Sequence, residues 1–153
     1  MGYFIVTSNL IILVISLNIS DKVHGKLTDF GSSRNINMLM TNMTFTKDIG
    51  RPMYMSPELL NKEKYKRSAD IYSFSITIYE VFKWGVVCPK ETFKFSWKIA
   101  EFITSGKRLP QHENMNSSEY NLISSCWIQN ANDRPSIGSV VNTLEELEEC
   151  GCV

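Results

Sequence analysis

The sequence predicts a mainly α-helical fold that begins with a short β-hairpin and contains about five helices. Two apolar runs, at residues 10–17 and 26–28, flank a polar turn at 18–25, as in a hairpin. Apolar residues recur at helical spacing in three later segments. The stretch 69–84 alternates apolar and polar residues between 73 and 78, as a half-buried strand would. Its sixteen residues nevertheless favour a helix, and apolar groups all round it indicate a buried one.

The three helical stripes follow one another through the second half of the chain. They consist of Trp97, Ala100 and Ile103, then Tyr120, Leu122, Ile123, Cys126 and Trp127, and finally Ile137, Val140, Val141, Leu144 and Leu147. We expect the first helix to stop at Gly106 and Ser136 to cap the last. Residues 34–55 show no sustained period and predict a long loop, which in a compact domain is usually functional or disordered.

Composition limits the classes of function. The chain has 153 residues, and its 16 Lys and Arg balance its 16 Asp and Glu, so charge does not favour a nucleic acid or an anionic membrane as partner. The four cysteines lack metal-ligand spacing, and they also lack the density of a secreted disulfide scaffold, which favours the cytoplasm. The apolar run 10–15 is too short to span a bilayer, so we expect a buried strand there, with a targeting segment as the alternative.

Four motifs occur in a fixed order along the chain. Asp29-Phe30-Gly31 comes first, Ser56-Pro57-Glu58 follows, "DIYSF" begins at Asp70, and "CWIQNANDRPS" begins at Cys126. In this order they resemble the second half of a protein kinase domain. The pairs Cys126-Trp127 and Arg134-Pro135 are similar to the tyrosine-kinase and tyrosine-kinase-like branches.

The resemblance implies a role for each motif around Mg and ATP. Asp29 matches the residue that binds magnesium bridging the ATP phosphates, and Asn9 is a candidate second metal ligand. Phe30 matches the side chain whose packing separates active from inactive states, and Gly31 permits the turn that holds Asp29. Hard oxygen ligands of this kind suit magnesium.

The resemblance also assigns roles in the activation segment and in the helical lobe. Residues 32–55 match the activation segment and peptide-docking loop, and Ser56-Pro57-Glu58 stands in for A-P-E. Glu58 and Arg134 match an ion pair that ties this segment to the helical body. Asp70 matches the helix-start aspartate that accepts hydrogen bonds from the backbone of the catalytic loop.

The sequence departs from the kinase pattern near its start. If Asn9 matches the catalytic-loop asparagine, Phe4 stands where the catalytic aspartate should be. The glycine-rich loop has no counterpart in residues 1–153, and Arg51 stands where serine/threonine kinases usually place threonine. We therefore expect a partial kinase domain with a catalytic-loop remnant at 1–25, D-F-G and activation segment at 26–58, helical lobe at 59–149 and tail at 150–153. A gene model that begins at the wrong methionine is the alternative explanation.

Three functions remain open on the sequence alone. The first is an ATP-dependent protein kinase that has little activity as the isolated chain. The second is a catalytically inactive, kinase-derived module that binds proteins, and the third is a small membrane-anchored protein. The expected partners are a protein substrate or docking partner and an upstream kinase that phosphorylates Thr44 and Thr46, near the cations Arg34 and Lys47.

The missing parts of the kinase pattern also predict a stability problem. The helix that bears Asp70 would lose the neighbours that cover it in the family fold. We therefore expect Ile71, Phe74, Ile78 and Phe82 to face water or a neighbouring molecule, and the chain to be aggregation-prone or dependent on a partner.

Overall fold

The described part of the chain is mainly helical. The computed structural model describes residues 11–15, 24–28, 52–64, 66–85, 87 and 95–149. In chain order these form β1 (Ile11–Ile15), β2 (His24–Thr28), the 3-10 helix η2 (Pro52–Tyr54), α1 (Pro57–Leu60), α2 (Ser68–Lys83), α3 (Ser96–Thr104), α4 (Ser117–Cys126) and α5 (Ile137–Glu149). The expected fold class, with an N-terminal hairpin and five helices within these ranges, is confirmed.

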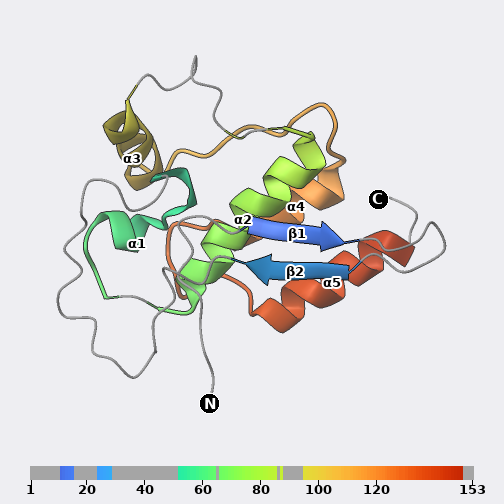
Figure 1. The fold of residues 1–153 in the computed structure, drawn as a ribbon. Coiled ribbons are helices and arrows are strands. Elements are labelled where there is room, and N and C mark those ends of the chain that lie inside the picture. The colour runs from blue at the N-terminus through green and yellow to red at the C-terminus, as the bar shows by residue number, and fades with distance from the viewer. Residues whose placement is uncertain are drawn as a thin grey trace.

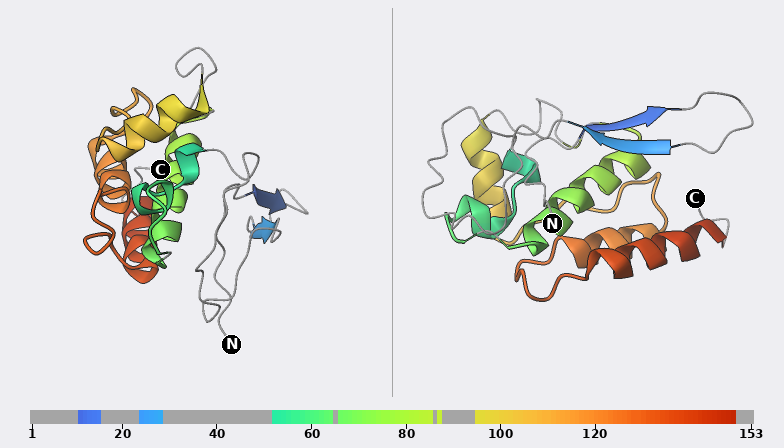
Figure 2. Two further views of the ribbon diagram at one scale, coloured as in Figure 1. Left: turned by 90° about the vertical axis from the view of Figure 1, so that its left-hand side faces the viewer. Right: turned by 60° about the horizontal axis from the view of Figure 1, so that its bottom comes forward.

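α2 is the central element of the helical body. It packs on α4, which in turn packs on α5, while η2 contacts both α2 and α3. Figure 1 shows α1 and α3 grouped near each other on one side of α2. Both views in Figure 2 place the hairpin beside the helices rather than among them. The helices therefore form the core, and α2 lies between α4 on one side and η2 on the other.

The two strands pair antiparallel, with Leu13 opposite Lys26. The expected second strand, 26–28, is two residues too short, because His24 and Gly25 belong to β2 rather than to the turn. These two residues pair with Ile15 and Val14. Backbone pairing across the hairpin, rather than side-chain type, assigns them to the strand.

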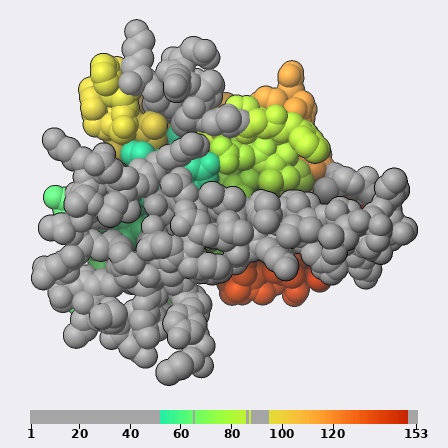
Figure 3. All heavy atoms as spheres, in the orientation of Figure 1, coloured from blue at the N-terminus to red at the C-terminus, as the bar shows by residue number. Residues whose placement is uncertain are grey.

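The expectation that α2 is a buried helix is confirmed, but its apolar side chains do not lose their cover. Ile71 and Ile78 are buried, so the expectation that they face water is wrong. Phe74 and Phe82 are partly buried and pack against the same core. The part of α2 that is exposed to solvent lies toward its C-terminal end, and Figure 3 shows this exposed surface. There, Trp84 ends the helix in the left-handed conformation (φ 56°) with 89% of its surface exposed.

The apolar stripes of α3 and α5 are only partly buried. Ile103 is the buried residue of α3, whereas Trp97 in its first turn is 61% exposed and stacks on Phe95, with ring centroids 6.2 Å apart. On α5, Val140 and Leu147 are buried, but Ile137 and Val141 are exposed. Side chains at the first turn or the flank of a stripe therefore reach past the edge of the core.

The ends of α3, α4 and α5 are set by local hydrogen bonds and backbone conformation. Gly106 follows α3 with φ +81°, and the amide of Ser139 donates to Ser136 Oγ at 3.2 Å, so both expected end signals are confirmed. α4 begins with a reciprocal capping box between Asn116 and Glu119, at 2.9 Å and 2.8 Å, which the sequence analysis missed.

Among the helices that the structure describes, none combines the length and the apolar character needed to cross a bilayer.

Candidate functional site

A buried ion pair joins α1 to the loop between α4 and α5. Arg134 donates from Nη1 to Glu58 Oε1 and from Nη2 to Glu58 Oε2, both at 2.8 Å, across 76 residues of sequence. The side chain of Arg134 is fully buried and that of Glu58 is 8% exposed. Two parallel charge-assisted hydrogen bonds fix the orientation as well as the distance of the two groups. The ion pair expected from the motifs is therefore present.

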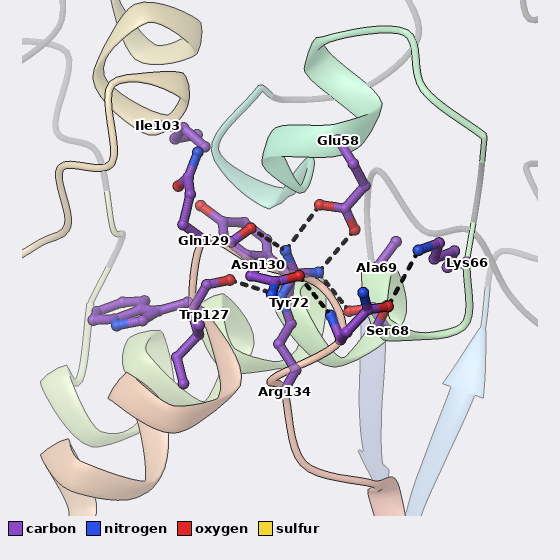
Figure 4. A network of polar contacts seen from close by, with 12 residues as sticks. Glu58, Lys66, Ser68, Ala69, Tyr72, Ile103, Trp127, Gln129, Asn130 and Arg134 are labelled. Carbon is purple, nitrogen blue, oxygen red and sulfur yellow. Dashed lines mark hydrogen bonds and ion pairs between the residues drawn. The ribbon is translucent and has the colours of Figure 1, made fainter.

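The guanidinium of Arg134 uses all five of its N–H groups. Besides the two bonds to Glu58, Nε donates to the carbonyl of Ile128 at 2.9 Å and Nη1 to the carbonyl of Ser68 at 2.8 Å. Nη2 also donates to the carbonyl of Gln129, at 3.4 Å. Figure 4 shows these contacts converging on Arg134 from α1, the start of α2 and the loop after α4. A buried cation with every donor satisfied joins three segments at one point.

The loop that carries Arg134 is shaped by its own polar residues. Asn130 Nδ2 donates to Asp133 Oδ2 at 2.9 Å, and the amide of Asp133 donates to the carbonyl of Asn130 at 3.1 Å. The amide of Asn132 donates to Asn130 Oδ1 at 3.1 Å. Asparagine and aspartate favour such turns because their short side chains bond the nearby backbone. The turn directs the side chain of Arg134 into the interior, shortly before the first residue of α5, Ile137.

Tyr72 of α2 lies against two arginines. The Cζ atoms of Arg134 and Arg108 lie 5.3 Å and 5.4 Å from the centroid of its ring. Arg108 also donates to the carbonyls of Trp127 (2.8 Å) and Ile103 (3.1 Å). Burial raises the pKa of Tyr72 to about 12, so its hydroxyl stays neutral at physiological pH. The two cations therefore meet a neutral aromatic face that links α2 to the connections around it.

The charge of Glu58 is maintained by its partner. Burial by itself raises the pKa of a carboxyl group, but the hydrogen bonds and the positive charge of Arg134 outweigh burial here, and the pKa of Glu58 is lowered. The carboxylate is therefore ionised at neutral pH and the pair remains a true ion pair.

A second set of contacts holds η2, which ends one residue before the Ser56-Pro57-Glu58 motif, on α2. The hydroxyl of Tyr54 donates to Glu80 Oε2, and Glu80 Oε1 accepts from the amide of Val87 at 3.0 Å. Ser73 Oγ donates to the carbonyl of Tyr54 at 2.6 Å. Residues 52–58 are thus fixed at one end by Glu80 and Ser73 and at the other by Arg134.

The residues expected to be structural all lie in the described part of the chain. Ser56 and Pro57 are buried, and Pro57 occupies the first turn of α1, where its fixed φ suits a helix start. Asp70 is half-buried in the first turn of α2. Trp127 is buried, with its ring 5.6 Å from that of Tyr79 and 6.1 Å from that of Tyr120.

The residues expected to bind metal or to regulate lie outside the described residues. These are Phe4, Asn9, Asp29, Phe30, Gly31, Thr44, Thr46 and Arg51. Asp29 directly follows the last residue of β2 in the sequence. Within the ranges that the structure describes, there is no cluster of three or more His, Cys, Asp or Glu that could hold a metal ion.

Sequence analysis did not identify several residues of this site. Nothing in the sequence marks Arg108 as a neighbour of Tyr72, because the contact depends on how the connection after α3 returns to α2. Tyr54 and Glu80 are 26 residues apart, and no spacing rule pairs them. The "PMY" that precedes Ser56-Pro57-Glu58 lay within the expected loop, although it forms a helical turn with two buried side chains.

Comparison with known families decides which family this geometry represents. The model of the family described as protein tyrosine and serine/threonine kinase matches residues 12–144. The chain belongs to the protein kinase family. The match includes α1, α2 and the loop that bears Arg134, so the ion pair joins two of the motifs that carried the resemblance.

The similar proteins include several from Dictyostelium discoideum. The kinase roco8, described as a probable serine/threonine-protein kinase, is 33% identical over 129 residues, which cover 84% of this chain and 7% of roco8. A LIM domain-containing probable serine/threonine-protein kinase is 31% identical over 138 residues, covering 88% of this chain and 20% of that protein. The RGS domain-containing serine/threonine-protein kinase A is 29% identical over 122 residues, covering 80% and 10%. The chain thus spans a fifth or less of the length of these relatives.

Two buried serines beside the ion pair and η2 should respond differently to alanine. Ser56 Oγ is buried and makes no hydrogen bond of good geometry, although the hydroxyl contributes to the lowered pKa of Glu58, whereas the O–H of Ser73 donates to the carbonyl of Tyr54 at 2.6 Å. We expect Ser73→Ala to lower the free energy of unfolding by about 1–3 kcal/mol, and Ser56→Ala to lower it by less. Urea denaturation of the two variants, which remove the same atom, measures the difference. A larger loss in Ser56→Ala than in Ser73→Ala would contradict it.

Proposed function

We propose that this chain provides the peptide-docking lobe of an ATP-dependent protein kinase, and that the phosphate acceptor is a serine or threonine of a protein substrate. The observation that carries the proposal is the fixation of residues 52–58, which form the end of the matched activation segment, by Arg134 on one side and by Glu80 and Ser73 on the other. A docking surface must keep its shape when a peptide binds, because ordering a loose segment would reduce the affinity. The names of the similar kinases support serine or threonine as the acceptor.

The catalytic chemistry of the family would use Asp29, with Asn9 as a second ligand, to hold magnesium on the ATP phosphates. Phosphoryl transfer depends chiefly on positioned charge, so a carboxylate directly after a strand suits this role. If Asn9 matches the catalytic-loop asparagine, Phe4 stands at the position of the catalytic aspartate, and on this alignment we propose that residues 1–153 alone transfer phosphate poorly or not at all. A catalytically inactive protein-binding module is the second candidate, and the same substitution favours it.

The same proposal covers regulation by phosphorylation, the branch of the protein kinase family and the cellular location of the protein. Thr44 and Thr46 are the proposed targets of an upstream kinase, since a phosphate in this segment can pair with Arg34 or Lys47. The Cys126-Trp127 and Arg134-Pro135 pairs support placement in the tyrosine-kinase-like branch. The free thiol of Cys126 and the use of ATP by the family support a cytoplasmic location.

We predict that the 153-residue chain binds Mg-ATP weakly. Asp29 and Asn9 would provide too few contacts for tight binding, since the family also uses a glycine-rich loop and a strand lysine to hold the phosphates. Isothermal titration should show no saturable binding at micromolar Mg-ATP. Micromolar affinity that disappears in Asp29→Ala, or phosphorylation of peptides by the pure chain, would show instead that these residues form a complete catalytic site.

Peptide docking should depend on the hydroxyl of Tyr54. Tyr54→Phe removes the hydrogen bond to Glu80 and leaves the ring in place, so residues 52–58 lose one of their attachments to α2. We expect binding of the chain to an array of serine- and threonine-containing peptides to weaken about threefold or more.

Tyr120→Phe is the matched control, because it removes a tyrosine hydroxyl that donates to the carbonyl of Leu109 at 2.8 Å, away from η2. The control should bind the array as the unaltered chain does. Equal binding by both variants and the unaltered chain, with Tyr54→Phe still folded, would contradict a docking role for residues 52–58.

A further inference from the structure

A groove of about 480 Å³ runs between α4 and α5. The right-hand view in Figure 2 shows these two helices side by side. The residues that line the groove are Ser118, Asn121, Leu122 and Ser125 from α4 and Thr143, Glu146 and Leu147 from α5. On each helix they are spaced by three and four residues, so they form one continuous face. The groove therefore results from two regular helix faces and not from an irregular loop.

The groove has an apolar floor and a rim rich in hydrogen-bond acceptors. Leu122 and Leu147 are buried at its base. The hydroxyls of Ser125 and Thr143 donate to carbonyls of their own helices, at 2.7 Å and 3.1 Å, which leaves their lone pairs as acceptors. Glu146 adds an exposed carboxylate. A ligand that brings donors and carries apolar stems would match both parts.

The charge of the two helices has one sign. α4 contains Glu119, and α5 contains Glu145, Glu146, Glu148 and Glu149, whereas neither helix contains Lys or Arg, although the whole chain has 16 of each sign. The four glutamates of α5 lie in its last two turns, where the helix dipole is already negative and carboxylates are unfavourable. Glu146 is the charged residue among those that line the groove, and the neighbouring glutamates make its surroundings negative, so the charge favours a positive partner.

We propose that this groove binds a short segment of a partner protein that is rich in arginine or lysine. The aliphatic stems of such side chains would lie over Leu122 and Leu147 while their cationic heads reach Glu146 and the acceptors of the rim. The groove contains no residue of the Glu58–Arg134 site, so this binding does not depend on the proposed docking or transfer of phosphate.

The test uses the 153-residue chain and a fluorescein-labelled peptide of alternating arginine and leucine, with fluorescence anisotropy at low ionic strength. Glu146→Gln should weaken binding about fivefold, as expected for the loss of one partly exposed ion pair. Glu145→Gln is the matched control: it removes the same charge from the adjacent exposed residue, which does not line the groove, and should change affinity by about twofold or less.

Asn121→Trp provides the second variant, because the larger ring at this exposed lining position obstructs the groove without altering the charge, and it should also weaken binding about fivefold or more. Equal weakening by Glu145→Gln and Glu146→Gln, with no effect of Asn121→Trp, would show attraction by the acidic helix end alone and overturn the proposal. Absence of saturable binding to the unaltered chain would overturn it as well.

Discussion

The bidentate ion pair between Glu58 and Arg134 is the constraint on which the rest of this lobe depends. A buried arginine is tolerated only where its charge and its donors are all satisfied, and here Glu58 and three backbone carbonyls satisfy them. Those carbonyls come from the loop after α4 and from the start of α2. The pair therefore fixes α1, α2 and the approach to α5 relative to one another, although these segments are far apart in sequence.

The proposed peptide-docking role follows from the position of the Glu58–Arg134 ion pair. α1 is the end of the segment that the family uses to dock peptides, and η2, just before it, is tied to α2 through Ser73 and Glu80. α2 itself is a core helix whose neighbours include α4. Tyr72 of α2 contacts both Arg134 and Arg108. Because Arg108 lies in the connection that follows α3, this connection is packed against α2 as well. If residues 52–58 dock peptides as proposed, their attachment to α2 at one end and to Arg134 at the other lets them keep their shape before a peptide arrives, which limits the entropy lost on binding.

The sequence allowed the helices and the ion pair to be predicted, but for different reasons. Periodicity located α3 to α5, since burial on one face leaves a pattern that can be read locally, whereas α2, which is buried on most sides, was predicted from the length of its apolar segment. The pairing of Glu58 with Arg134 was predicted only from the motifs that contain them, because no local pattern pairs residues that are 76 positions apart. Trp97 belongs to the predicted apolar stripe but is 61% exposed, since periodicity cannot show where the core ends. Arg108 and the Tyr54–Glu80 contact left no signal because tertiary packing alone creates them. The capping box at Asn116 and Glu119 was readable and was missed.

A double-mutant cycle on the ion pair tests this account most directly. Glu58→Gln, Arg134→Gln and the double variant keep much of the side-chain volume, and urea denaturation gives the free energy of unfolding of each. Each single change leaves one buried partner unsatisfied, so the account predicts that the double variant is more stable than the sum of the single losses implies, with a coupling energy of about 2 kcal/mol or more. Additive losses, with a coupling energy near zero, would contradict the claim that this pair organises the lobe.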